Sequence, residues 1–191
     1  MVSALLVSSS EKGREMLREL MRGVPEISPA VAASGAEARR LAAEVEYDLV
    51  VINAPLSDEL GDGLSCTLAM DTSAGILLLV RAETADEIAE KVEDVGVMVL
   101  GKPLGRAMFY QALKMVAAAR RRVLGLKQEN RKLQSKIEEI RLVDRAKCML
   151  IQYLSMTESQ AHRYIEKQAM DQRKTRAEVA RDVLRRYDLD T

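Results

Sequence analysis

The chain has 191 residues, of which 48% are hydrophobic, so it can bury one large core or two small ones. Its formal net charge is zero, but residues 1–110 contain 10 basic and 18 acidic residues, whereas residues 111–191 contain 19 basic and 11 acidic residues. No apolar run approaches the roughly 18 residues of a membrane span, and the two distant cysteines exclude a disulfide scaffold and a zinc site, so we expect a cytoplasmic protein.

Apolar and amphipathic segments alternate through the first 110 residues. Four short runs are apolar at consecutive positions, as buried parallel strands are, and a weaker run lies between the first two. The predicted strands are residues 4–7, 29–33, 49–52, 76–80 and 97–100, and the predicted helices are residues 11–22, 36–45, 64–70 and 85–93. This alternation predicts an α/β fold with a doubly wound five-stranded parallel sheet, in a domain of residues 1–112.

The segment after residue 104 contains no proline and can therefore sustain long helices. Within it, apolar residues recur with the heptad spacing of a coiled coil, beginning at Val116. Asn130 takes one core position of this seam, where a single Asn fixes the register and favours two strands. We predict a coiled-coil helix over residues 113–141. A homodimer would form through Val123, Leu126, Asn130, Leu133, Ile137 and Ile140.

Two features of this helix weigh against a dimer. The residues at the e and g positions beside the seam are mostly basic, so a parallel pair would bring like charges together. These basic residues are Arg120, Arg122, Lys127, Lys136 and Arg141. Gly125 also costs about 1 kcal/mol in a helix interior. The alternative interpretation is a helix that packs on its own sheet.

Two capping boxes mark the starts of two short helices near the end of the chain. In each, a threonine (Thr157 or Thr175) is followed three residues later by Gln or Glu. We predict that these two helices and the end of the long helix form a small all-α three-helix bundle over residues 142–191. We expect its core to contain Ala146, Leu150, Leu154, Ala161, Ile165, Ala169, Met170, Val183 and Leu184, with Val179 or Ala180.

The first domain resembles the receiver domain of two-component response regulators. The resemblance rests on the strand spacing, on Tyr47–Ile52 with Pro55 and Gly61 beyond it, and on Gly-Lys-Pro at 101–103. Lys102 matches the invariant lysine of that family, which contacts the phosphoryl group.

The phosphotransfer positions that the resemblance implies are degenerate. The nucleophile position holds Asn53, whose amide cannot form an acyl phosphate. The acidic pair is replaced by Ser8 and Ser9, which supply no charge for Mg²⁺. We therefore predict a pseudo-receiver that is not phosphorylated, in which Lys102 is a structural or interface residue.

Two further positions of the receiver pattern also differ. The expected hydroxyl is replaced by Val80 or Arg81, and the aromatic switch residue by Val99. Asp48 and Asp58 are the acidic residues that could substitute for the nucleophile, but Asp48 begins a strand and Asp58 lies several residues late in a loop.

Residues 142–184 resemble an ANTAR domain, the antiterminator module of regulators such as the amidase and nitrate-assimilation antiterminators. The matching residues are Ala146–Leu150, Met156–Ala161, Tyr164, Ala169, Met170, Arg173 and Ala180. With the coiled coil and the degenerate receiver, they resemble the amidase antiterminator subclass. The resemblance implies binding of RNA stem-loops in nascent transcripts, which favours an antiterminator hairpin over a terminator. The RNA-binding candidates are Lys147, Arg163, Lys167, Gln168, Arg173, Lys174 and Arg176.

Other functions remain open at this point. The charge asymmetry supports a basic RNA-binding half, although the two halves could instead neutralise each other by packing. The second hypothesis is a dimeric signalling adaptor that binds protein and no nucleic acid; a regulatory partner at the pseudo-receiver fits either hypothesis. DNA binding is a third, but no helix–turn–helix glycine turn lies between Gln172 and Glu178. Without a nucleotide loop, ligand cluster or nucleophile–base pair, we expect neither an enzyme nor a bound cofactor or metal.

Overall fold

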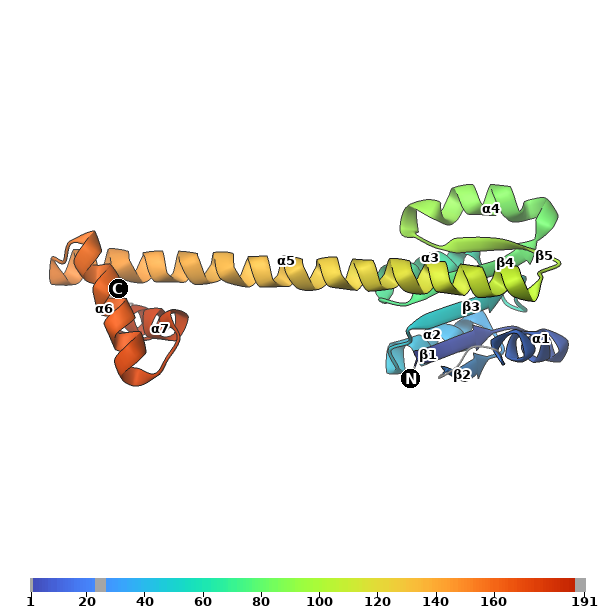
Figure 1. The fold of residues 1–191 in the computed structure, drawn as a ribbon, viewed down its shortest axis with the longest axis horizontal. Helices are drawn as coiled ribbons and strands as arrows, with labels where there is room; N and C mark the ends of the chain where they lie inside the picture. Colours follow the sequence, from blue (N-terminus) through green and yellow to red (C-terminus); the bar gives the residue numbers. More distant parts are fainter. Residues whose placement is uncertain (1, 23–26, 188–191) are drawn as a thin grey trace. The chain divides into compact units, whose positions relative to one another are not determined.

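The computed structural model describes residues 2–22 and 27–187 of the chain (Figure 1). The chain divides into two compact units, Met1–Gly125 and Leu126–Thr191. Both domain boundaries expected from the sequence, after residues 112 and 141, lie inside one unbroken helix, α5 (Arg106–Leu154). The last four residues of the expected bundle, 188–191, lie outside the described residues.

The first unit contains a five-stranded parallel sheet in the order β2-β1-β3-β4-β5. The inner strands are β1 (Val2–Val7), β3 (Leu49–Asn53) and β4 (Gly75–Arg81), and they are buried over most of their length. The outer strands are β2 (Ile27–Ala32) and β5 (Met98–Lys102). The inner strands are continuously apolar because both faces of the sheet are covered. The doubly wound five-stranded sheet is confirmed.

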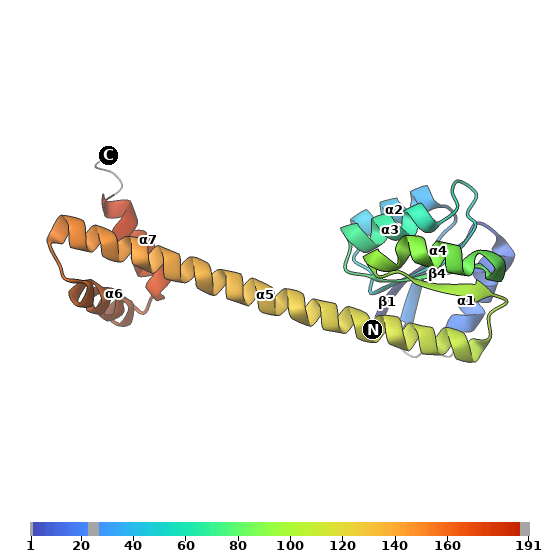
Figure 2. The ribbon, with the colours of Figure 1, turned by 90° about the horizontal axis from the view of Figure 1, so that it is seen from above.

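Helices cover both faces of the sheet (Figure 2). Helices α2 (Gly35–Glu44), α3 (Asp62–Asp71) and α4 (Ala85–Val92) pack on one face, and α1 (Glu11–Met21) packs on the other beside the first turns of α5. Short 3-10 turns, η1 (Ala82–Thr84) and η2 (Glu93–Val95), flank α4. The four helices expected between the strands are present, with ends that differ by at most two residues.

The first turns of α5 belong to the core of the sheet and not to a coiled-coil seam. Phe109 is fully buried, and Val116 is 6% exposed. A Cβ atom at Gly75 would lie 2.3 Å from Cγ1 of Val116, so glycine is what allows α5 to approach the start of β4. The expectation that Val116 lies in the seam is therefore wrong, because its side chain packs on the sheet. The alternative of a helix packed on its own sheet holds for this part of α5.

The second unit is a three-helix bundle of the end of α5, α6 (Glu158–Gln172) and α7 (Arg176–Tyr187). Both capping boxes form. The hydroxyl of Thr157 accepts a hydrogen bond from the backbone N–H three residues later at 3.3 Å, and that of Thr175 does so at 3.2 Å. In each case the side chain of the later residue returns to the threonine N–H. None of the helices described here is long and apolar enough to cross a membrane.

The core of the bundle matches the expected one with two exceptions. Its buried residues are Ala146, Leu150, Ala161, Ile165, Val179, Ala180, Val183 and Leu184, with Ala169 partly buried. Met170 is 79% exposed, because five residues after Ile165 it points about 140° away from the core face of α6. Leu154 is 45% exposed and is the last residue of α5. The expectation that these two side chains pack in the core is wrong.

Candidate functional site

Lys102, Asn53 and Ser8 form one hydrogen-bonded chain at the carboxyl ends of the strands. Lys102 Nζ donates to Asn53 Oδ1 at 2.9 Å and to the Ala54 carbonyl at 2.6 Å. Asn53 Nδ2 donates to Ser8 Oγ at 3.1 Å, and Ser8 is 1% exposed. The structure thus brings these predicted positions together, and their polar groups satisfy one another.

The surroundings of this chain carry positive charge. Arg14 Nη1 donates to the carbonyls of Ser8 at 2.9 Å and Ser9 at 3.1 Å. Arg81 is the register neighbour of Lys102 between β4 and β5. Burial lowers the pKa of the Lys102 ammonium below its ordinary value, and the charge of Arg81 lowers it further. Mg²⁺ prefers carboxylate ligands, and the hydrogen-bonded chain of Lys102, Asn53 and Ser8 supplies none.

The two acidic residues that could have substituted for the nucleophile have other contacts. Asp58 accepts hydrogen bonds from the backbone N–H groups of Gly35 and Ala36, both at 3.0 Å, at the start of α2. These bonds lower the pKa of the Asp58 carboxyl. Asp48 pairs with Arg120 of α5 at 2.8 Å. Nor do the side chains of the described residues include a cluster of three or more His, Cys, Asp or Glu that could hold a metal ion.

Lys147 forms ion pairs with two carboxylates of the bundle. Its Nζ lies 2.8 Å from Asp144 and 3.0 Å from Glu158, and 17% of its side chain is exposed. Hydrogen bonds to Asp144 and then Glu158 raise the pKa of the Lys147 ammonium. Of the RNA-binding candidates, Lys147 makes the most ion pairs with described residues, two against one for Lys174 and one for Arg176.

The basic cluster between α6 and α7 is partly ion-paired. Lys174 Nζ lies 2.7 Å from Asp182, and Arg176 lies 3.7 Å from Glu139. Arg173 is the C-cap of α6 in the left-handed conformation, with φ 53°, and its side chain is exposed without an ion pair among the described residues.

Arg163 and Lys167 lie one turn apart on α6. Both are exposed, and neither makes a side-chain hydrogen bond or ion pair in the described part of the chain. They are free to meet a phosphate without breaking an internal contact.

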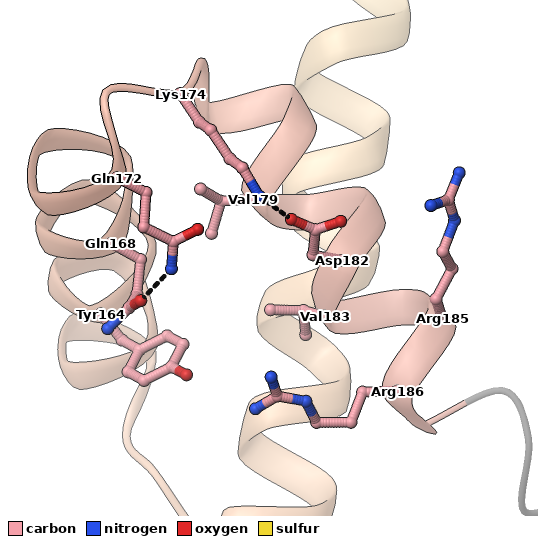
Figure 3. Close-up of a pocket in the computed structure, with 9 residues that line it drawn as sticks. All are labelled: Tyr164, Gln168, Gln172, Lys174, Val179, Asp182, Val183, Arg185 and Arg186. Carbon is pink, nitrogen blue, oxygen red and sulfur yellow. Dashed lines mark hydrogen bonds and ion pairs between the residues drawn. The ribbon is translucent and has the colours of Figure 1, made fainter.

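A groove of about 500 Å³ lies between α6 and α7 (Figure 3). On the α6 side, Tyr164, Gln168 and Gln172 follow one another at four-residue spacing, and Gln172 Nε2 donates to Gln168 Oε1 at 2.6 Å. Figure 3 shows the Arg186 side chain of α7 extending toward Tyr164. The groove is completed by Lys174, Val179, Asp182, Val183 and Arg185.

The groove contains two of the predicted residues, Gln168 and Lys174, and others that the sequence prediction did not include. Gln172 shares the face of Gln168 at i,i+4 spacing, which could have been read from the sequence. Arg185 and Arg186 could not be assigned in this way, because their position opposite α6 depends on how the helices cross.

The predicted dimerisation residues form an apolar stripe along α5. Val123, Leu126, Leu133, Ile137 and Ile140 are between 49% and 61% exposed, and Asn130 is exposed among them. Gly125 lies inside the helix, which is not interrupted there. No element of the described chain covers this stripe.

Comparisons with known proteins agree with both halves of the fold. A family model of the ANTAR domain matches residues 131–184, a range that includes part of α5 before residue 142. The chain is 32% identical over 171 residues to the transcriptional regulatory protein PdtaR of Mycobacterium tuberculosis. This alignment covers 89% of the chain and 81% of PdtaR.

Solved structures resemble the first unit. The signal receiver domain of an HD domain-containing protein from Pseudomonas fluorescens has a TM-score of 0.58 at 24% identity, covering 65% of this chain and 92% of that one. The chemotaxis response regulator CheY4 of Vibrio cholerae has a TM-score of 0.53 at 24% identity. That match covers 61% of this chain and 98% of CheY4. At this identity the likeness shows the receiver fold alone.

Proposed function

Because this chain belongs to the ANTAR-domain family of transcription antitermination regulators, we propose that its C-terminal unit binds RNA stem-loops in nascent transcripts. The observation that carries the proposal is the groove between α6 and α7. It combines a half-buried aromatic ring, Tyr164, with the amides of Gln168 and Gln172 and the guanidinium of Arg186. RNA loops are recognised by unstacked bases that lie on aromatic or Arg planes, by hydrogen bonds to base edges and by basic contacts to phosphates.

The basic residues around the groove differ in how readily they can meet a phosphate. Arg163, Lys167 and Arg173 are exposed and unpaired within the described chain, so a phosphate contact breaks no internal ion pair. Lys174 and Arg176 would exchange Asp182 and Glu139 for a phosphate. Lys147 would have to leave two carboxylates, so we assign it a structural role in the bundle.

We further propose that the receiver-like domain regulates RNA binding without being phosphorylated. Lys102 already donates to Asn53, and Ser8 accepts from the same amide. The input would then come from a regulatory protein. A groove of about 260 Å³ between the loop that joins β3 to α3 and helix α4 supports this idea, with Leu60 73% exposed at its edge. The apolar stripe of α5 supports a homodimer through a two-stranded coiled coil.

The test of RNA binding is the salt dependence of stem-loop affinity. Replacing Arg185→Gln and Arg186→Gln removes two positive charges from the groove without touching the buried core. Affinity should fall, and the log–log salt slope should flatten by about one unit for each phosphate that the variant no longer binds. The matched control is Arg18→Gln with Arg40→Gln, which removes the same charge from exposed positions of the receiver-like unit.

The competing functions give different results in the same experiment. A protein-binding adaptor would show no salt-dependent retention on RNA. A DNA-binding protein would prefer duplex DNA of the same sequence to the stem-loop. Equal affinity and equal salt slope for the variant and the control, with circular dichroism unchanged, would rule out the α6–α7 groove as the RNA site.

A further inference from the structure

Four basic residues flank the apolar stripe of α5. In the heptad set by that stripe, Arg122 and Lys136 occupy g positions, and Lys127 and Arg141 occupy e positions. All four side chains are exposed, and none makes a hydrogen bond or an ion pair with any residue that the structure describes. We call these four residues the basic flank.

Like Arg163, Lys167 and Arg173, the basic flank has no carboxylate partner among the described residues, whereas three other basic residues do. Lys147, Lys174 and Arg176 are all held by carboxylates. Along the stripe from 122 to 141, Glu129 is the one acidic residue at an e or g position, and Gln134 is neutral. The charges beside the stripe are therefore not paired with carboxylates in the part of the chain that the structure describes.

A parallel pair of α5 helices would bring the basic flank together. Each g residue then faces the e residue five positions further on in the second copy. Arg122 faces Lys127 of that copy, and Lys136 faces its Arg141. Each like-charge contact occurs twice by symmetry and opposes association, whereas the apolar stripe favours it. An anion between the facing residues would convert this repulsion into attraction.

We propose that the basic flank is a binding site for the phosphodiester backbone of RNA, complete only when two copies of α5 pair. The inference rests on the proposed RNA binding and adds a role for it in assembly. Each phosphate would accept charge-assisted hydrogen bonds from the g residue of one copy and the e residue of the other. Because the coupling of two binding events is reciprocal, RNA strengthens the dimer by the same factor as the dimer strengthens RNA binding.

The first test uses the full chain without RNA. Arg122→Glu with Lys136→Glu turns the like-charge contacts into Glu–Lys and Glu–Arg pairs. Arg121→Glu with Lys132→Glu is the matched control, because it changes the net charge equally at outer positions of the heptad. At low salt the flank variant should dimerise about tenfold more tightly than the control, which corresponds to about 1.4 kcal/mol.

The salt trend gives the sharper readout. Sedimentation equilibrium should show that salt tightens the wild-type dimer, because it screens repulsion between exposed charges. Salt should weaken the dimer of the flank variant, because it screens attraction. A flank variant that follows the same trend as the wild type, or that stays monomeric with it at every salt concentration, would overturn the proposal.

The second test adds a polyanion. A stem-loop RNA, and inorganic polyphosphate as a probe without bases, should each tighten the wild-type and control dimers about tenfold and leave the flank variant unchanged. If the stem-loop binds but the dimer constant of the wild type does not move, the flank site is wrong and the RNA function stands. If the stem-loop does not bind at all, both are wrong.

Discussion

Lys102 Nζ lies 2.9 Å from Oδ1 of Asn53, so the lysine that matches the phosphate-contacting lysine of receiver domains is satisfied by a neutral amide. The amide accepts the hydrogen bond but supplies no charge and no nucleophilic oxygen. Asn53 also donates to Ser8, which connects two of the altered positions with the matching lysine. Lys102, Asn53 and Ser8 thus form a hydrogen-bonded contact that joins the carboxyl ends of β1, β3 and β5.

Small phosphodonors should leave the chain unmodified. Asn53 cannot form an acyl phosphate, and Ser8 and Ser9 offer no carboxylate to Mg²⁺. Intact-mass spectrometry after incubation with a phosphodonor and Mg²⁺ measures this directly. Asn53→Asp alone should also stay unmodified, because it restores the nucleophile and not the metal ligands. A mass gain of one phosphoryl group on the wild type would contradict the absence of phosphorylation.

The lowered pKa of Lys102 predicts a dependence of stability on pH. Between the lowered folded value and the ordinary value of 10.5, the unfolded chain binds more protons than the folded chain. The free energy of unfolding should therefore rise with pH through that window. Below the window the Lys102 ammonium stays charged, so its burial lowers the free energy of unfolding by the full amount. Urea unfolding across this window should show a smaller rise for Lys102→Met. The pKa values of Lys91 and Lys147 are raised, so these two residues make the free energy of unfolding depend on pH only above pH 10.5. Equal slopes for wild type and variant would refute the assignment to Lys102.

The capping box of α7 should contribute measurably to the bundle. Thr175→Ala removes the hydroxyl that accepts from the Glu178 N–H, and we expect a loss of about 1 kcal/mol of stability. Thr175→Ser keeps the hydroxyl and is the matched control. The difference between the two variants in urea unfolding of the full chain measures the cap. No difference between alanine and serine would show that the hydroxyl does not stabilise α7.

The sequence predicted the fold well where one physical cause dominates. Runs such as Leu49–Ile52 are apolar at every position because the sheet is covered on both faces, and no other local structure competes. The prediction failed where the same heptad spacing fits both packing on the sheet and pairing with a second helix. Val116 fits the heptad, yet it packs at Gly75, because α5 leaves the sheet only after this turn. Spacing alone does not tell an intramolecular face from an intermolecular one.

The candidate sites were predictable to different degrees. Asn53, Ser8 and Lys102 were assigned from the resemblance to receiver domains, and their proximity follows from topology, because the carboxyl ends of parallel strands meet at one edge. The pairing of Lys147 with Glu158 was not visible, because it depends on how α6 turns back along α5. The same holds for Arg186 opposite Tyr164.

The apolar stripe of α5 predicts that a single charge will prevent dimerisation. Leu133 is 53% exposed and contacts no core, so Leu133→Asp should leave both units folded while placing a carboxylate in the seam. Gln128→Asp, at an outer heptad position, is the control. Light scattering at micromolar concentration, with RNA present, should show a dimer for the control and a monomer for Leu133→Asp. A monomeric wild type, or a dimer that survives Leu133→Asp, would contradict the coiled coil.

The basic cluster before α7 predicts graded effects on RNA affinity. Arg173→Gln should weaken binding across stem-loop sequences and flatten the salt slope by about one unit, because this side chain has no ion pair with the described residues to lose. Lys174→Gln and Arg176→Gln should have smaller effects, since Asp182 and Glu139 compete with the phosphates for these side chains.

Removing the carboxylate of Asp182, which competes with RNA for Lys174, should change the RNA affinity in the opposite direction. Asp182→Asn should raise RNA affinity, because it frees Lys174 and takes away a negative charge from the groove. The double variant Asp182→Asn with Lys174→Gln should lose that gain, which separates the release of Lys174 from a general change in charge. The pair is exposed, so neither variant should disturb the core of the bundle. If Asp182→Asn leaves the affinity unchanged while Arg173→Gln lowers it, Lys174 does not contact RNA, and the phosphate contacts lie on the Arg173 side of the cluster.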